Sequence, residues 1–263
     1  MRPGPRPAAV VTGASSGIGA SFARELADRG HDLVLVARRS DRLEILRDEL
    51  ESKTGASVRP VVADLATREG QAAAGEAIDA VADRLRVLVL NAGAGAWGRF
   101  AELDPAGERD RVALNVDSVV VLARRGLPAL LRSAGGGLVI VSSLAAWQAT
   151  PFMATYAAAK AFQLRFAEAL AEEVRGSGTA VVAVCPGPVA TEFHWVAGTE
   201  SLMRRVPVLQ PREVALSGLE ALEAARSGVR VLGWRNRASA AAVSLLPRRL
   251  VTRISGRIHR PPT

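Results

Sequence analysis

The chain has 263 residues, of which 49% are hydrophobic and 4% aromatic, and its formal net charge is +8 at pH 7. This length and composition exclude a disordered chain and allow one large α/β core built mainly from Ala, Val and Leu. A single cysteine excludes an internal disulfide, and three scattered histidines predict no metal site. The start of the sequence does not resemble a secretory signal, and the apolar stretches are shorter than the ~20 residues of a membrane span. We therefore expect a cytoplasmic protein.

Short β-branched segments alternate with longer helical patterns along most of the chain. The predicted strands are Ala8–Thr12, Asp32–Ala37, Val58–Ala63, Val87–Leu90, Leu138–Ser142, Ala180–Cys185 and Val229–Leu232. The predicted helices are Ile18–Arg29, Asp41–Lys53, Arg68–Ala82, Glu108–Arg132, Phe152–Arg175 and Arg212–Ala225. Because the strands are nearly continuous apolar runs that alternate with helices, we expect one Rossmann-type α/β domain, a doubly wound parallel sheet with helices on both faces.

A glycine-rich turn, T-G-A-S-S-G-I-G at residues 12–19, follows the first strand and opens the first helix. Glycines let the backbone turn tightly and approach a pyrophosphate, which then binds the free amides at the helix start. The predicted cofactor contacts in this turn are Gly13, Ser15, Ser16, Gly17, Ile18 and Gly19. The spacing G-x-x-x-G-x-G differs from the usual G-x-G-x-x-G fingerprint, and a purely structural turn is the alternative.

The second strand ends in Ala37-Arg38-Arg39. Rossmann enzymes that prefer NAD usually place an acidic side chain here, against the ribose 2′-hydroxyl. A guanidinium group instead matches a 2′-phosphate in charge and in geometry. We therefore predict NADP as the cofactor, with NADPH favoured over NADH, and expect Arg38 to contribute more than Arg39. The alternative is that one or both arginines are solvated.

Tyr156 is the only tyrosine of the chain, and Lys160 is one of only two lysines beside 32 arginines. On a helix, a spacing of four residues places both side chains on one face. The pKa of a tyrosine is normally ~10, and an adjacent ammonium group is expected to lower it by ~1–3 units, toward the range of a general acid/base. Lysine also has a compact head that can bond two ribose hydroxyls. An ordinary amphipathic helix is the alternative.

These motifs, in this order, resemble those of the short-chain dehydrogenases/reductases over residues 8–191, in the branch that includes hydroxysteroid dehydrogenases and ketoacyl reductases. The resemblance implies further cofactor contacts at Asp64, Leu65, Asn91, Ala92, Gly93, Pro186, Gly187, Val189 and Thr191, beside Tyr156 and Lys160. It also implies two more catalytic residues, Asn115 and Ser143. Ser143 is preferred to Ser142 because it lies thirteen residues before Tyr156, the usual spacing in the family.

The reaction implied by this resemblance interconverts a ketone and a secondary alcohol by hydride transfer. Ser143 and Tyr156 would bind the carbonyl oxygen, and Tyr156 would supply the proton. Lys160 would hold the nicotinamide ribose and stabilise the phenolate, and Asn115 would hold a water that passes protons to Lys160. The resemblance also implies a homodimer or homotetramer. A non-catalytic NADP(H)-binding regulator is the alternative, because a fold does not fix a function, although the intact set of four catalytic residues argues against it.

Several aromatic residues are expected near the substrate end of the site: Trp97, Trp147, and Phe193, His194 and Trp195 in the segment Glu192–Gln210, which also contains Met203. Lined in this way, a pocket would favour a bulky apolar carbonyl compound as the small-molecule substrate. The alternative is that these aromatics pack inside the protein or an oligomer. His194 is expected to be a loop residue rather than a ligand.

The last forty residues contain nine arginines and no acidic residue, whereas the other 223 carry 25 basic and 26 acidic groups, a net of −1. Leu250, Ile254 and Ile258 recur at helical spacing, which predicts an amphipathic helix over Pro247–Ile258. We assign residues 1–233 to a dinucleotide-binding catalytic domain and residues 234–263 to a basic amphipathic C-terminal extension. The extension is expected to pack on the domain or a symmetry mate; peripheral membrane contact is the alternative, and the absence of a nucleic-acid motif argues against nucleic acid.

Overall fold

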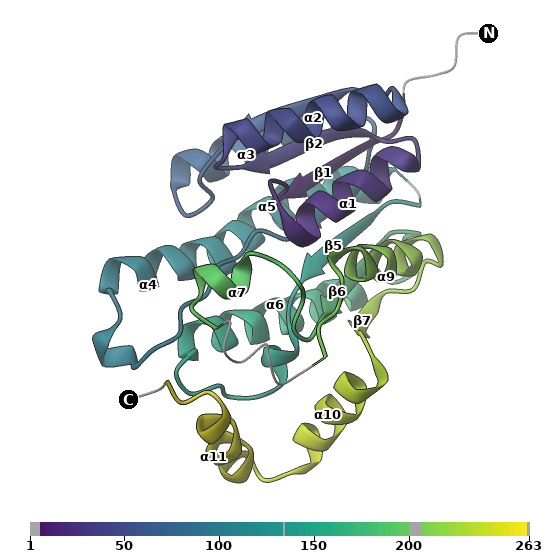
Figure 1. The fold of residues 1–263 in the computed structure, drawn as a ribbon. Coiled ribbons are helices and arrows are strands. Elements are labelled where there is room, and N and C mark those ends of the chain that lie inside the picture. The colour runs from purple at the N-terminus through teal and green to yellow at the C-terminus, as the bar shows by residue number, and fades with distance from the viewer. Residues whose placement is uncertain (1–5, 134, 200–206, 262–263) are drawn as a thin grey trace, which may run out of the picture.

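The computed structural model describes residues 6–133, 135–199 and 207–261. Its centre is a sheet of seven strands, all parallel, in the order β3-β2-β1-β4-β5-β6-β7 (Figure 1). The strands are β1 (Ala8–Thr12), β2 (Asp32–Ala37), β3 (Val58–Val62), β4 (Leu85–Leu90), β5 (Gly137–Val141), β6 (Ala180–Cys185) and β7 (Gly228–Val231). The predicted doubly wound sheet is confirmed, with strand ends that differ by one or two residues.

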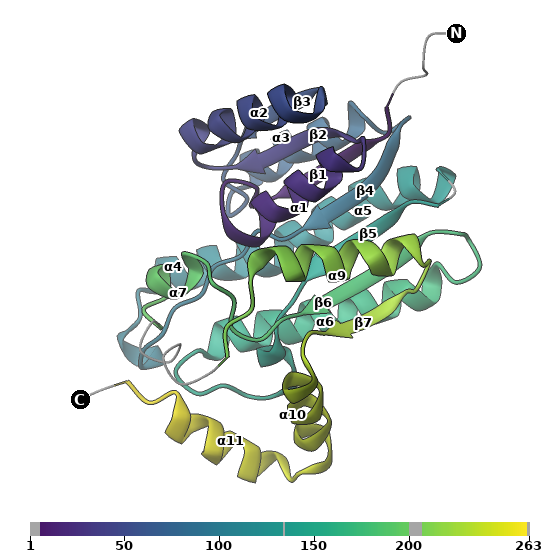
Figure 2. The ribbon, with the colours of Figure 1, turned by 45° about the vertical axis from the view of Figure 1, so that its right-hand side comes forward.

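Three helices cover each face of the sheet (Figures 1 and 2). On one face lie α1 (Gly17–Asp28), α2 (Ser40–Thr54) and α9 (Pro211–Glu223); on the other lie α3 (Arg68–Asp79), α5 (Ser118–Arg132) and α6 (Ala154–Glu173). Successive strand residues point to opposite faces, so Val10 packs in one core and Val11 in the other. This double burial explains why the inner strands β1, β5 and β6 are apolar throughout.

The chain reverses its direction of winding between β1 and β4, which are neighbours in the sheet although two strands separate them in the sequence. In open α/β sheets, ligands bind at such a switch point, beyond the carboxyl ends of the strands. The predicted motifs directly follow strands β1 to β6 along the chain. The fold therefore gathers them at one edge of the sheet.

The helix predicted over Glu108–Arg132 is interrupted. It consists of α4 (Pro105–Val112), a π-helical turn η2 (Ala113–Asp117) and α5. Asn115 lies in this turn, and its main-chain carbonyl accepts a hydrogen bond from Gln163 Nε2 of α6 at 2.8 Å. The wider turn thus directs a backbone carbonyl away from its own helix, and π-turns of this kind are frequent at functional sites.

Two helices follow β7 and lie together beyond the end of the sheet (Figures 1 and 2). They are α10 (Trp234–Leu245) and α11 (Arg248–Ile258). The second agrees with the predicted amphipathic helix; the first was not predicted, because its alanine-rich sequence has no apolar periodicity. Short elements η1 (Phe100–Glu102), η3 (Leu144–Trp147) and α7 (Phe193–Val196) complete the description. None of the helices in the described ranges is long and apolar enough to cross a membrane.

Candidate active site

A cavity of about 1090 Å³ lies at the carboxyl ends of the strands. At one end it is lined by the glycine turn and the arginines after β2, and at the other by the segment after β5, α6 and the C-terminal helices. Every predicted catalytic or cofactor-binding residue lines this cavity except Gly19 and Asn115. Its volume is at the upper end of the ~300–1,000 Å³ typical of ligand pockets, enough for a nucleotide together with a second molecule.

The glycine turn forms a cradle that side chains would fill. Gly13 and Gly17 have positive φ angles of 65° and 55°, which favour glycine. A Cβ on Gly19 would lie 2.2 Å from the Gly13 carbonyl oxygen, so this glycine keeps the helix α1 close to the turn although it does not line the cavity. The exposed amides at the start of α1 fit a pyrophosphate group, as expected for a dinucleotide cofactor.

Thr12 connects the glycine turn to the segment after β4. Its hydroxyl donates to the Val89 carbonyl at 3.2 Å and accepts from the amides of Asn91 and Ala92 at 2.9 and 3.1 Å. The Asn91 side-chain amide donates back to the Thr12 carbonyl at 3.0 Å. These bonds fix the N-A-G segment beside the turn, where both border the cavity.

Arg38 and Arg39 have different surroundings. Arg39 donates to the hydroxyls of Ser15 and Ser16 in the glycine turn and pairs with Glu192 at 2.8 Å. The Arg38 side chain is 71% exposed, and its nearest acid is Asp64 at 3.7 Å. Arg38 therefore has a guanidinium group available for a ligand, whereas Arg39 already stabilises the protein.

Glu192 was not expected at this end of the site. Its two carboxylate oxygens accept from Arg39 and Arg42, at 2.8 and 2.6 Å. Hydrogen bonds from these two arginines lower the pKa of Glu192 to about 2. The pairing joins the segment after β6 to the start of α2, and no local pattern reveals it because 150 residues separate Arg42 from Glu192.

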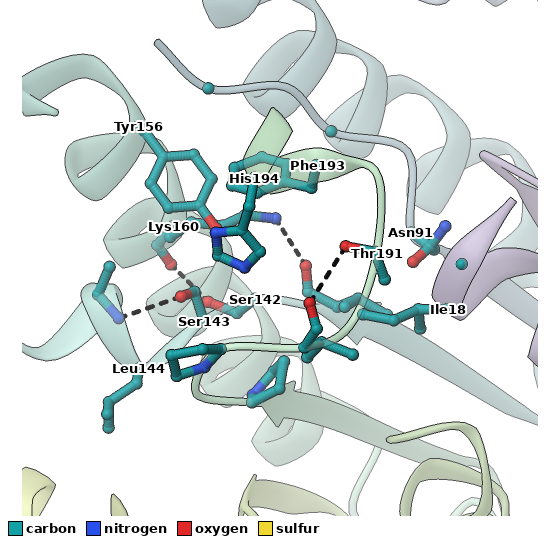
Figure 3. A pocket seen from close by; sticks show the side chains of 18 of the residues that line it. Ile18, Asn91, Ser142, Ser143, Leu144, Tyr156, Lys160, Thr191, Phe193 and His194 are labelled. Atoms are coloured by element: carbon teal, nitrogen blue, oxygen red, sulfur yellow. Dashed lines mark hydrogen bonds between the residues drawn. The ribbon is translucent and has the colours of Figure 1, made fainter. Parts of the chain in front are cut away.

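Ser143, Tyr156 and Lys160 line the same part of the cavity, from the end of β5 and from α6 (Figure 3). The Ser143 and Tyr156 hydroxyls are within hydrogen-bonding reach of each other. The neighbouring Ser142 hydroxyl instead donates to the Lys160 main-chain carbonyl at 2.8 Å. On the far side, the Phe193 ring packs against the Tyr156 ring with centroids 5.2 Å apart.

The predicted effect of Lys160 on the tyrosine pKa is wrong for this structure. Burial raises the pKa of Tyr156 to about 12, and the hydrogen bond with Ser143 only partly opposes this. Burial likewise lowers the pKa of Lys160 to about 8. The Lys160 Nζ atom is 5.7 Å from the centre of the tyrosine ring and donates elsewhere, so its charge does not offset the loss of water around the phenol.

Gln163, which the sequence reasoning missed, holds Lys160 in place. The Lys160 ammonium donates to the Val141 carbonyl at 2.8 Å and to Gln163 Oε1 at 2.9 Å. Because Gln163 also donates to the carbonyl of Asn115, it links the lysine to the π-helical turn. The signal in the sequence was a polar residue on the buried side of α6, one turn after Lys160.

Asn115 lies behind the cavity rather than on its surface. Its side-chain nitrogen donates to the carbonyls of Ala94 and Arg111, at 2.9 and 2.8 Å. Its side-chain oxygen is buried and has no partner among the described residues. A Cβ on Gly93 would lie 2.8 Å from this oxygen and 3.4 Å from Lys160 Nζ, so both polar groups approach the same glycine.

The aromatic residues predicted for the substrate end divide into two groups. Trp147, Phe193 and His194 line the cavity. Trp97 does not line it but lies next to it, since its Nε1 donates to the carbonyl of the lining residue His259 at 2.6 Å; Trp195 does not line it and is 76% exposed. Met203 lies outside the described residues.

The C-terminal helices complete the substrate end. Trp234, Asn236 and Val243 of α10 line the cavity, as does Ile258 at the end of α11. Asn236 packs directly on the turn after β6, because a Cβ on Gly187 would lie 2.7 Å from its Nδ2 atom. The segment beyond residue 233 thus forms one wall of the site.

The family model for short chain dehydrogenase matches residues 7–201. The chain belongs to the short-chain dehydrogenase family. It is 30% identical to the 7beta-hydroxysteroid dehydrogenase of Clostridium sardiniense, over 81% of each protein. It is 32% identical to the very-long-chain 3-oxoacyl-CoA reductase of Anas platyrhynchos, over 72% of this chain and 62% of that protein.

Among solved structures, a short-chain dehydrogenase from Sphingobium yanoikuyae in complex with NADPH superimposes with a TM-score of 0.79, at 32% identity. The match covers 91% of this chain and 93% of that one. These similarities confirm the expected family, its relatives among hydroxysteroid dehydrogenases and ketoacyl reductases, and the class of enzyme, a nicotinamide-nucleotide-dependent dehydrogenase or reductase.

Proposed function

We propose that this short-chain dehydrogenase interconverts a bulky apolar ketone and its secondary alcohol, with NADP(H) as the cofactor. The observation that supports it most directly is one cavity that joins a glycine cradle and an exposed Arg38 to the Ser143, Tyr156 and Lys160 side chains. A solved relative at 32% identity contains NADPH, and two relatives are named for steroid and very-long-chain acyl substrates. Cytoplasmic location and homo-oligomeric assembly remain predictions.

The nucleotide would bind with its pyrophosphate on the glycine turn and its 2′-phosphate near Arg38. When bound, it supplies the hydride. The protein's residues position the carbonyl compound beside it, with Ser143 and Tyr156 donating hydrogen bonds to the carbonyl oxygen. This orientation places the electrophilic carbon toward the nicotinamide side of the cavity.

Tyr156 holds the proton that the developing alkoxide needs. With a pKa of about 12, the phenol is protonated throughout the neutral range, so in the cofactor-free protein it carries the proton that reduction consumes. Lys160, fixed by Val141 and Gln163, retains a third N–H that can meet the ribose or the phenolate left after proton transfer. The buried oxygen of Asn115 is suited to hold a water near Lys160.

Turnover of a carbonyl panel tests this proposal: steroid ketones, 3-oxoacyl thioesters and aromatic ketones, each with NADPH and NADH. We expect oxidation of NADPH with at least one bulky ketone. Tyr156→Phe should lower this activity by about 10²–10⁴-fold, the usual contribution of a general acid, while NADPH binding, measured by fluorescence, stays within about twofold.

The two lysines of the chain provide a matched control. Lys160→Met should also abolish activity, whereas Lys53→Met should not, because Lys53 is an exposed residue paired with Asp28 on the surface. A Tyr156→Phe variant with near wild-type turnover would contradict the proposed chemistry. NADPH binding without turnover of any panel member would instead support the non-catalytic regulator.

A further inference from the structure

Helix α11 packs on the protein through one face and leaves a row of apolar side chains on another face exposed. Val251 and Ser255 are buried, at 7% and 2% exposure. Leu250, Ile254 and Ile258 form the second row, one turn apart, and are 46%, 45% and 60% exposed. Isolated exposed leucines are ordinary, but a row of three on one helix is a continuous apolar surface.

A row of arginines runs beside this exposed apolar row. Arg249, Arg253 and Arg257 each precede one of its members by a single residue, which on a helix is an offset of ~100°. None of the three forms an ion pair within the described part of the chain, and from Ala224 to the C-terminus the sequence has no acidic residue. The helix therefore presents apolar and cationic side chains together to the outside.

The mouth of the cavity has the same apolar character. Val196 of α7, Trp234 of α10 and Ile258 of α11 all line the cavity, and yet they are 60–74% exposed. Ile258 belongs both to this rim and to the exposed row of α11. Through Ile258, the lining of the site and the exposed apolar row of α11 are therefore continuous.

We propose that this surface docks on an anionic lipid bilayer, with the cavity opening toward the lipid. The exposed row of α11 would enter the boundary between headgroups and acyl chains, while the arginines extend to lipid phosphates. Trp234 at the rim is of a residue type that prefers this interface. The docking proposal is independent of the proposed function. Its consequence, that an apolar ketone reaches the site from the membrane, rests on the proposed function.

The positive charge of α11 favours an anionic bilayer over a second copy of the chain as the partner of this surface. A two-fold interface pairs the same patch with itself, so it would place arginine rows against arginine rows. With no acidic residue in the C-terminal forty to oppose them, such an arrangement is repulsive. An anionic bilayer instead supplies the missing negative charge.

Vesicle co-sedimentation of the full chain tests the proposal. The two vesicle types are phosphatidylcholine alone and phosphatidylcholine mixed with phosphatidylglycerol. We expect binding to the anionic vesicles, much weaker binding to the neutral ones, and a loss of binding at high salt. Leu250→Ser with Ile254→Ser, and separately Arg253→Gln with Arg257→Gln, should each weaken binding about tenfold.

Matched variants on other surfaces serve as controls. Ile45→Ser with Val62→Ser removes two apolar side chains that are more exposed than Leu250 and Ile254, and Arg165→Gln with Arg175→Gln removes two exposed charges. Both should bind vesicles as the wild type does. Tyr156→Phe should also bind normally, so that a failure of the proposed catalysis is distinguishable from a failure of docking.

Three results would overturn the proposal. The first is equal pelleting with and without anionic vesicles. The second is that the wild-type protein does not bind vesicles and the Leu250→Ser, Ile254→Ser variant has a different oligomeric state, measured by sedimentation velocity. The surface would then be an interface between copies of the chain. The third is binding of a short DNA duplex in place of vesicles, lost in the Arg253→Gln, Arg257→Gln variant.

Discussion

Arg38 and Arg39 are neighbours in the sequence, but only Arg39 donates hydrogen bonds within the described residues, whereas Arg38 has a single long ion pair, with Asp64 at 3.7 Å. A charged hydrogen bond contributes about 1.5–3 kcal/mol. We therefore expect Arg38→Ala to weaken NADPH binding by about 10–100-fold and to leave NADH binding almost unchanged. Arg39→Ala should weaken both nucleotides together, because it releases Ser15 and Ser16 of the glycine turn.

Fluorescence titration with each nucleotide measures this difference. Arg47→Ala is the control, since Arg47 lies on the outer surface of α2 and pairs only with neighbours on that helix. An unchanged preference between NADPH and NADH in Arg38→Ala would show that the 2′-phosphate is bound elsewhere.

The pKa of Tyr156 can be read directly because the chain has no other tyrosine. Burial raises this pKa from 10.0 to about 12. In the cofactor-free protein the phenolate absorbance should therefore appear only above pH 11, whereas in denaturant it should appear near pH ~10. Between these values the unfolded chain loses a proton that the folded chain keeps, so the free energy of unfolding falls as the pH rises.

A spectrophotometric pH titration of native and denatured protein makes the measurement, with Tyr156→Phe as the blank. A native midpoint at or below 10 would mean that Lys160 outweighs burial, as the sequence alone suggested. Ser143→Ala should raise the midpoint further, because the Ser143 hydroxyl favours the ionised phenol.

That the candidate residues lie around one cavity could be predicted from sequence, but their electrostatics could not. Motif order and spacing were enough to bring Ser143, Tyr156 and Lys160 into one cavity. The sign of the tyrosine pKa shift depends on how much water the completed fold removes, which spacing does not encode. Glu192 and Gln163 were missed for a related reason, since their partners are distant in the sequence or belong to the main chain.

Among the elements, the glycine turn makes the sharpest prediction. A Cβ on Gly19 would meet backbone atoms of Gly13, which cannot move without opening the turn. We expect Gly19→Ala to lower the free energy of unfolding by about 1–3 kcal/mol and to weaken nucleotide binding by more than tenfold. Urea unfolding and fluorescence titration measure the two effects.

Gly75→Ala is the matched control for that variant. Gly75 lies inside α3, and a Cβ there would make only ordinary contacts with the Arg125 side chain, 3.7 Å away. Because alanine favours a helix over glycine, this variant should be more stable by about 0.5–1 kcal/mol, with unchanged nucleotide binding. Equal effects of the two substitutions would mean that close packing at the turn is unimportant.

Strands were easier to predict than helices in this chain. Burial on both faces gives the inner strands β1, β5 and β6 continuous apolar sequences, whereas the edge strands β3 and β7 each contain an arginine and were found from their valines. The interruption of the helix around Asn115 depends on a hydrogen bond from Gln163, 48 residues away, and so leaves no local signal. Helix α10 is held by contacts such as Asn236 on Gly187 rather than by an apolar face of its own.

In the molecule as a whole, the two ends of the cavity come from different parts of the chain. The nucleotide end is built by the segments after β1 to β4, and the substrate end by α6, the segment after β6 and the two C-terminal helices. The excess of positive charge is confined to the last forty residues, which include the two C-terminal helices at the substrate end. Binding of the nucleotide and of the carbonyl compound should therefore respond separately to changes in these parts.

Removal of α11 tests this separation. A chain that ends at Leu246 loses Ile258 and His259 from the cavity wall, and Trp97 loses its hydrogen-bond acceptor. We expect NADPH affinity to stay within about twofold and KM for a bulky ketone to rise about tenfold, as for the loss of ~1.4 kcal/mol of apolar contact. The melting temperature should fall by a few degrees, because Val251 and Ser255 no longer pack on the body.

A chain that ends at Arg260 is the matched control, since it keeps α11, the Ile258 contact and the His259 peptide carbonyl that accepts from Trp97. It should have wild-type KM values for both substrates. If the chain ending at Leu246 loses NADPH affinity as much as ketone affinity, the C-terminal helices support the whole cavity rather than its substrate end. If the chain ending at Leu246 keeps the wild-type KM for every bulky ketone, the wall formed by α11 does not contact the substrate.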